Sequence, residues 1–171
     1  MKSGFWAFNT YLLLLAGLLV GCQTPDSKKK KEFSTFRMHL ETNPDGTERS
    51  SEVTIGRSEP FSVNTEKAPF ITENQVEHAS VLDALGGFQI MVQFTQQGKW
   101  LLEQYSLAAR GKRAAIFSNF GETRWLAAPK FARRISDGVL VFTPDCTREE
   151  ADRIVRGLNN TVKDQTRKGN R

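Results

Sequence analysis

The most regular pattern of apolar and polar positions lies in the second half of the chain, between residues 111 and 158. Three short apolar runs predict strands there, at residues 113–118, 123–127 and 138–143. Thr147 with Glu150 three residues later has the form of a capping box, which predicts that a helix begins at this point. Apolar residues then recur at helical spacing, at Ala151, Ile154, Val155 and Leu158. That stripe needs a surface to pack on, and the neighbouring strands can supply it.

The first half of the chain predicts further strands. Residues 36–41 alternate apolar and polar, which is typical of a half-buried strand and places His39 on the solvent face. The sequence Asn-Pro-Asp-Gly at residues 43–46 predicts a turn. Residues 52–56 are then expected to return as the second arm of a hairpin. A metal-binding role for His39 is disfavoured by its position on the expected solvent face.

The middle of the chain adds a helix between strands. Thr72 and Gln75 form a second capping box, expected to open a short helix to about residue 79. Residues 80–85 and 88–94 predict strands joined at Gly86-Gly87, the second at the centre of the sheet. A helix over residues 97–110 follows, capped by Thr95 and ended by Gly111. Its expected buried side consists of Trp100, Leu101, Tyr105 and Ala108.

These elements predict an α+β fold, a small antiparallel or mixed sheet with two main helices packed on one face. The 171 residues suffice for one modest domain with tails, and 39% hydrophobic and 25% charged residues are ordinary for a globular protein. Glycine in the first turn of the second helix, Gly98, implies a packing reason, because glycine destabilises a helix by about 1 kcal/mol relative to alanine. After residue 158 the chain becomes polar and basic, and we expect it to fray.

The N-terminus has the three-part form of a secretory signal, with Lys2 before an apolar core that is too short for a comfortable membrane span. The sequence Leu-Val-Gly-Cys at residues 19–22 resembles the bacterial lipobox. The resemblance implies cleavage before Cys22 and acylation of that cysteine, so that acyl chains hold the protein to a membrane. The alternative is an ordinary cysteine near a cleavage site. Gln23 after the cysteine favours the outer membrane over the inner, with the domain in the periplasm.

Two further features near the termini have plain alternatives. Four lysines at residues 28–31 either contact anionic headgroups beside the anchor or form a solvated spacer, and the spacer is favoured.

If Cys22 carries lipid, Cys146 is left without a disulfide partner. Cys146 precedes a helix start, where its pKa could be lowered. A small half-buried residue in a turn is the favoured interpretation.

Residues 72–160 resemble a known family. The segment begins with a hairpin, a strand ending in Phe-Thr and a helix. It continues with Gly-Lys-Arg-Ala-Ala-Ile (111–116), Ala-Ala-Pro (127–129), and Phe-Thr before a Glu-Glu-Ala helix (142–151). This order is similar to that in the head of the first periplasmic region of SecD, a subunit of the bacterial protein-export machinery. The resemblance covers about half of the chain. It implies a SecD-head-like fold and a role in holding emerging polypeptide. SecD itself has several membrane spans that contain functional acidic residues. The present sequence shows no membrane span after the signal, so the resemblance extends to the periplasmic module and not to the ion-driven action of SecD.

The resulting organisation has five parts: a signal peptide (1–21), a flexible basic tether (22–34), a β-hairpin extension (35–70), the SecD-head-like domain (71–160) and a polar basic tail (161–171). Whether residues 35–70 join the main sheet is left open at this stage. No catalytic motif is evident: no motif links either histidine, His39 or His78, to a nucleophile, and no phosphate loop is present. The carboxylates between Asp145 and Asp152 suit a helix dipole better than acid–base chemistry, and a hydrolase is the weakest interpretation.

A binding module is the favoured class, with no cofactor and no metal. The candidate partner-binding residues are a basic, aromatic group around Pro129: Arg124, Trp125, Lys130, Phe131, Arg133 and Arg134. The equal alternative is that Trp125 is core and the arginines form a solvated rim. The secretory signal argues against nucleic acid as a partner. We therefore expect a non-enzymatic envelope lipoprotein that binds polypeptide or a protein, with translocon components among the candidate partners. The alternative is a structural docking lipoprotein of the outer membrane without an export role.

The lipid anchor gives a direct test. Replacement of Cys22 by serine (Cys22→Ser) removes the only atom at this position that can carry a thioether-linked lipid, so the variant should leave the membrane fraction of cells. Fractionation followed by immunoblotting measures this. Retention of the variant in the membrane fraction to the same extent as the parent chain would refute acylation at Cys22.

Overall fold

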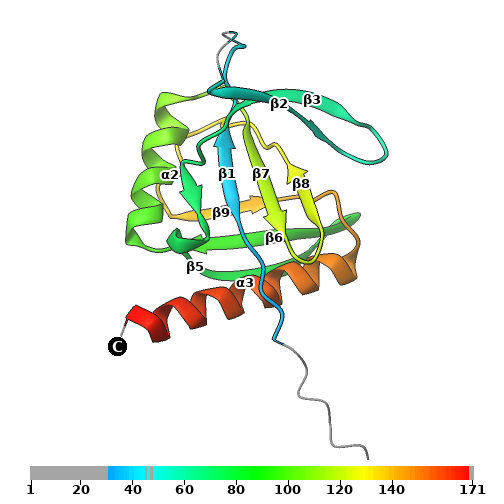
Figure 1. Cartoon of the computed structure of the whole chain (residues 1–171), viewed down its shortest axis with the longest axis vertical. Coiled ribbons are helices and arrows are strands. Elements are labelled where there is room, and N and C mark those ends of the chain that lie inside the picture. The colour runs from blue at the N-terminus through cyan, green and yellow to red at the C-terminus, as the bar shows by residue number, and fades with distance from the viewer. Residues whose placement is uncertain (1–30, 45, 47, 170–171) are drawn as a thin grey trace, which may run out of the picture. The chain divides into compact units, whose positions relative to one another are not determined.

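The strands divide among three antiparallel sheets (Figure 1). The computed structural model describes residues 31–169 apart from 45 and 47, so the expectations for the signal peptide, for Cys22 and for most of the tether lie outside the described residues. The four-stranded sheet has the order β4 (Ile71–Thr72), β1 (Arg37–Leu40), β7 (Ala114–Asn119) and β8 (Thr123–Ala127). The three-stranded sheet has the order β5 (Val76–Ala84), β6 (Gly87–Phe94) and β9 (Val139–Phe142).

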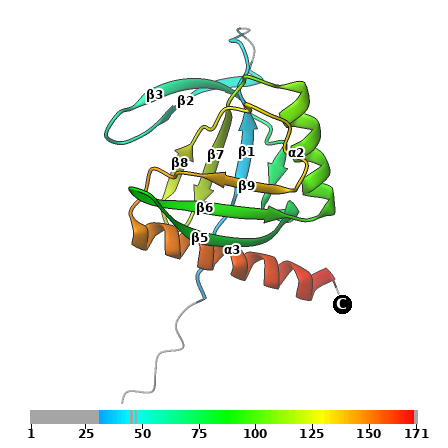
Figure 2. The same ribbon diagram turned by 180° about the vertical axis from the view of Figure 1, so that it is seen from behind.

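A two-stranded ribbon and two helices complete the α+β fold. The ribbon pairs β2 (Ser50–Ile55) with β3 (Phe61–Glu66). A short 3-10 helix, η2 (Glu73–Gln75), leads into β5, and the long helices are α2 (Gln96–Ala108) and α3 (Arg148–Gly169). The strands of the four-stranded sheet run across those of the three-stranded sheet, with α3 below and α2 at one side (Figures 1 and 2). The α+β class expected from the sequence is confirmed.

The main core lies between the two larger sheets and the helices. Phe36, Met38 and Leu40 enter it from β1 and the residue before it, and Ile90, Val92 and Phe94 enter it from β6. Helix α3 adds the predicted stripe, of which Ala151, Ile154 and Leu158 are buried. A second, smaller cluster lies under the ribbon and consists of Val53, Ile55, Val63, Ala115 and Ala128, with Trp125 packed against it. The four-stranded sheet is therefore covered on both faces.

Strand β1 corrects two expectations. It does not form a hairpin with residues 52–56: β1 pairs with β4 and β7, while β2 pairs with β3. The 35–70 segment thus supplies a strand to the main sheet. His39 does not face solvent, because the ribbon covers that face of β1 and leaves the residue 8% exposed. Alternation reports only that neighbouring residues point to opposite faces, and here both faces are buried.

The middle of the chain follows most of its predictions. β6 is central in its sheet, between β5 and β9, as expected. The capping box at Thr72 is confirmed, because its backbone N–H donates to the Gln75 side chain at 2.9 Å. The helix that it opens is shorter than expected: it ends at Gln75, and the residues up to Ala79 already belong to β5.

Helix α2 begins after the predicted cap, with the Gly98 N–H donating to Thr95 Oγ1 at 3.3 Å. Its expected buried side is partly wrong. Trp100 is 72% exposed, and the buried positions are Gly98, Leu102 and Ser106. The packing reason for Gly98 is visible: a Cβ there would lie 2.7 Å from the Gln75 carbonyl oxygen and 2.8 Å from Phe94 Cβ.

Helix α3 has the predicted start and a longer course than expected. The Thr147 N–H donates to Glu150 Oε2 at 2.7 Å, and the Glu150 N–H donates to Thr147 Oγ1 at 3.2 Å. The polar sequence after Leu158 does not fray but continues the helix to Gly169. Polar side chains hold this part in place, because Asn160 and Thr161 bond to the backbone of Glu32 and Ser34.

The close contact at Gly98 predicts a specific loss of stability. Gly98→Ala should lower the free energy of unfolding by about 1–3 kcal/mol, since an added methyl must displace backbone atoms. Gly169→Ala is the matched control: no atom lies within 4 Å of its Cβ position, and alanine favours the helix. Urea unfolding of both variants measures the difference. Equal stability of Gly98→Ala and the parent chain would show that the contact relaxes freely.

Candidate functional site

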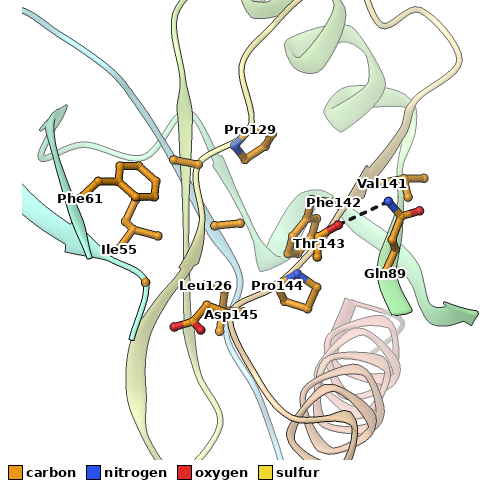
Figure 3. Close-up of a pocket in the computed structure, with 13 residues that line it drawn as sticks. Ile55, Phe61, Gln89, Leu126, Pro129, Val141, Phe142, Thr143, Pro144 and Asp145 are labelled. Atoms are coloured by element: carbon orange, nitrogen blue, oxygen red, sulfur yellow. Dashed lines mark hydrogen bonds between the residues drawn. The ribbon is translucent and has the colours of Figure 1, made fainter. Parts of the chain in front are cut away.

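An apolar groove separates the free edge of β9 from the end of β8 (Figure 3). It has a volume of about 560 Å³. One wall is β9 with the residues that follow it, and the other is the end of β8 with Pro129. The tip of the β2–β3 ribbon adds Ile55 and Phe61, which lie across the end of β8 from Phe142 and Thr143 (Figure 3). Val141 lines the groove and is 41% exposed. The groove thus brings apolar side chains and a strand edge together at the surface.

The hydrogen-bond pattern of β9 shows which of its backbone groups face the groove. The Phe94 N–H donates to the Gly138 carbonyl at 3.0 Å, and the register pairs Val92 with Leu140 and Ile90 with Phe142. Because bonded pairs alternate in an antiparallel ladder, the backbone groups of Leu140 and Phe142 face β6. Those of Val139 and Val141 therefore face outward. The Asp137 carboxylate already accepts from the Val139 N–H at 3.1 Å. Val141 presents its outward N–H and C=O to the groove.

The opposite edge of the same sheet is closed. There, the Asn159 side chain of α3 bonds to both backbone groups of Ala79 on β5: it accepts from the N–H and donates to the C=O, each at 2.9 Å. The amide thus takes the place of a neighbouring strand. Of the two edges of the three-stranded sheet, β5 is covered by a helix and β9 is left open.

A charged cluster fixes the ribbon tip beside the groove. Arg57, in the turn of the ribbon, lies 3.7 Å from the Asp145 carboxylate and 3.2 Å from that of Glu150. Arg124 lies 3.0 Å from the same Glu150 oxygen. Burial acts to raise the pKa of Glu150, but the Thr147 N–H and the guanidinium of Arg124 hold it below its usual range. The cluster ties β2–β3 to the start of α3, so the groove keeps its third wall.

A second hollow of about 400 Å³ continues along β9, between Val139–Val141 and residues 129–137. Lys130 and Arg133 are exposed on this loop, and Arg134 pairs with Glu103 of α2. The two hollows together follow the open strand over its length, with basic side chains at one end.

The structure does not bring the six predicted partner-binding residues into one patch. Phe131 is 1% exposed and belongs to the main core, where its ring meets that of Phe70. Trp125 is half-buried under the ribbon, with its ring 5.1 Å from that of His39 and 5.2 Å from that of Phe117. Arg124 is engaged by Glu150. Lys130, Arg133 and Arg134 lie on the loop beside the second hollow.

The groove itself is hardly visible in the sequence. The apolar run at residues 138–143 predicts a strand that contains Val141, but neither the edge position nor the exposure of Val141 can be read from such a run. Pro144, after the strand, is a usable signal that pairing ends there.

The remaining reactive residues are buried rather than displayed. Burial raises the pKa of Cys146 to about 11, so its thiol stays protonated at neutral pH, in agreement with a half-buried turn residue. Burial also lowers the pKa of His39, whose Nδ1 lies 2.9 Å from the Glu66 carbonyl oxygen. Among the described residues no group of three metal-ligating side chains comes together, and no helix there is long and apolar enough to cross a membrane.

Comparison with known proteins gives likeness in structure alone. No protein-family model and no curated protein sequence matches the chain. Solved structures do match, among them SecDF in a super-membrane-facing form (TM-score 0.56, 18% identity, 76% of this chain) and SecDF described as a membrane component that enhances protein export (TM-score 0.55, 16% identity, 94% of this chain). This chain spans 19% of the first protein and 71% of the second. The resemblance to a SecD periplasmic domain is confirmed at the level of the fold.

The burial of His39 predicts how stability depends on pH. The lowered pKa means that the unfolded chain binds a proton more tightly than the folded one, so His39 reduces stability as pH falls below about 6.5. Replacement by asparagine (His39→Asn) should reduce this loss between pH 7 and 5, by a slope of at most about 1.4 kcal/mol per pH unit. Exposed His78, changed to asparagine, is the control. Equal slopes for the two variants in urea unfolding would contradict the prediction.

Proposed function

We propose that this protein is a non-enzymatic, lipid-anchored protein of the cell envelope that binds extended polypeptide by strand addition at β9. The observation that carries the proposal is the open edge of β9: Val141 directs a backbone donor and acceptor into an apolar groove. An extended chain can complete such an edge with main-chain hydrogen bonds, while the groove takes alternate side chains. Main-chain recognition suits a binder of many sequences.

The shape of the groove supports an extended ligand over a small molecule. It is an open channel that continues along the strand into the second hollow, not an enclosed cavity. Phe61 and Val141 supply exposed apolar surface, and the Arg113 guanidinium lies 5.1 Å from the Phe61 ring. Lys130 and Arg133 favour chains with acidic residues near the bound segment.

The proposal also states where the protein acts, in the cell envelope, and in which process, protein export. The predicted signal peptide (residues 1–21), followed directly by Cys22, supports acylation and a position in the periplasm, with the outer membrane favoured. The fold shared with SecDF, which in one structure is described as enhancing protein export, supports a role near exported chains and translocon components. The competing function, a structural docking lipoprotein, requires no open strand.

Proline at position 141 tests strand addition. Because the Val141 N–H faces the groove, Val141→Pro removes the docking donor without breaking a bond to β6. Affinity for an unfolded, reduced and alkylated polypeptide should fall by about tenfold or more, as expected from loss of one or two hydrogen bonds. Val141→Thr keeps the N–H and is the control. Fluorescence anisotropy measures both, and circular dichroism verifies folding. Unchanged affinity in a folded Val141→Pro variant would rule out this edge.

Crosslinking in cells separates the two functions. A photoreactive phenylalanine at Val141 should form adducts with many exported chains, because its side chain lines the groove. The same residue at Leu85, exposed in the β5–β6 turn, is the control. Adducts from Val141 to one abundant envelope protein alone would favour the docking function, and equal patterns at the two positions would contradict a polypeptide site at β9.

A further inference from the structure

The outer face of α3 carries a stripe of positive charge. Residues at i, i+3, i+7, i+10 and i+14 share one side of the helix: Arg153, Arg156, Asn160, Lys163 and Arg167. The four cations are exposed, and the stripe lies opposite the buried positions Ala151, Ile154 and Leu158. At 1.5 Å per residue it extends over about 20 Å.

The helix alone does not account for this stripe. A helix dipole favours cations in the last turn, which includes Arg167 but not Arg153, Arg156 or Lys163. The neighbouring carboxylates are few: Glu32 lies 3.1 Å from Arg156, and Asp164 lies 2.9 Å from Lys168. Within the described part of the chain, Arg153, Lys163 and Arg167 make no ion pair. Lys168 lowers the pKa of the Asp164 carboxyl by a hydrogen bond, and Arg167 lies near enough to help lower it. Because Asp164 is already paired with Lys168, all three cations without an ion pair are available to an external anionic partner.

The N-terminal segment enters the fold across this helix (Figure 1). The Asn160 amide donates to the Glu32 carbonyl at 3.0 Å, and the Thr161 hydroxyl donates to the Ser34 carbonyl at 2.9 Å. Gly157 makes room for the crossing, because a Cβ there would lie 2.2 Å from Ser34 Oγ. Residues 32–34 are therefore held against α3 at the side of the stripe.

The two residues that this crossing displays have the chemistry of a membrane interface. Phe33 is 49% exposed, and the Lys31 ammonium lies 5.7 Å from the centre of its ring. An exposed aromatic ring beside several cations suits the boundary between headgroups and acyl chains. An acidic protein partner would match the charge but would not require the exposed ring.

The chain that connects α3 to the proposed lipid anchor at Cys22 also favours a membrane as the partner of this face. Cys22 precedes Lys31 by nine residues, a distance of about 30 Å at full extension. An acylated Cys22 would keep the α3 face within reach of the bilayer at all times. We propose that Arg153, Arg156, Lys163 and Arg167, with Lys31 and Phe33, dock on the surface of a membrane containing anionic phospholipids. Of the arguments for membrane docking, only the short distance to Cys22 rests on the proposed lipid anchor. The exposed cations and the exposed ring of Phe33 are independent of it.

Vesicle binding without the acyl chain tests the surface by itself. A chain that begins at Gln23 lacks Cys22 and retains residues 31–171, which form one compact unit with its own core. It should co-sediment with vesicles of phosphatidylethanolamine and phosphatidylglycerol, but not with neutral phosphatidylcholine vesicles, and added salt should release it. Each exposed cation strengthens binding to an anionic surface by roughly fivefold, so Arg153→Gln, Lys163→Gln and Arg167→Gln together should weaken it by about a hundredfold.

A charge-matched triple variant is the control. Lys67, Arg110 and Lys112 are exposed cations outside α3, just after β3 and just after α2, and their replacement by glutamine removes the same net charge. This variant should keep most of its vesicle binding. Phe33→Ser should weaken binding several-fold without a change of charge.

Equal losses in the two triple variants, or equal binding to neutral and anionic vesicles, would overturn the proposal. So would binding to an acidic polypeptide in the absence of vesicle binding. Because the chain used lacks Cys22, none of these results depends on acylation, and affinity for unfolded polypeptide is measured separately at β9.

Discussion

Strand β1 is hydrogen-bonded on both sides, to β4 and β7, and buried on both faces. Met38 enters the main core on one face, and His39 meets Trp125 under the ribbon on the other. A central strand supplies two ladders and two packing surfaces at once, so its removal would leave β7 without a partner on that side and both cores open. The sequence motifs that resemble a SecD head begin only at residue 72, but the structural match to SecDF covers 76% or more of the chain and so includes part of the segment before them.

The groove follows from an asymmetry in how edges are protected. An exposed strand edge invites pairing with other chains, and proteins usually cover or charge such edges. Here α3 covers β5 and donates an amide to its backbone, while the Asp145 N–H bonds to the Leu126 carbonyl at the far end of the groove. The ion pairs of Arg57 with Asp145 and Glu150 then hold the ribbon tip beside the groove. The same helix thus protects one edge and, through its first turn, shapes the other.

Local signals were predictable, and distant pairings were not. Caps at Thr72, Thr95 and Thr147 depend on residues three positions apart, and the structure has all three. The partner of β1 depends on residue 116, far along the chain, and turn signals wrongly favoured the nearest strand. For the site, charge and aromatic content indicated the loop after β8 but not which of its side chains are displayed, and Phe131 turns inward. The outward N–H and C=O of Val141 follow from the place of β9 at the end of its sheet. Edge position is a property of the assembled sheet.

The two proposed surfaces are compatible because they lie at opposite sides of one sheet. Helix α3 packs on β5, and β9 is two strands away, so a polypeptide added to β9 would lie three strand spacings, roughly 15 Å, beyond β5. The strands of this sheet run alongside α3 in both views (Figures 1 and 2). A helix lying flat on the bilayer would therefore hold the bound segment roughly parallel to the membrane and clear of it. Docking through the basic stripe would orient the groove without occupying it, which the proposed lipid anchor alone does not achieve.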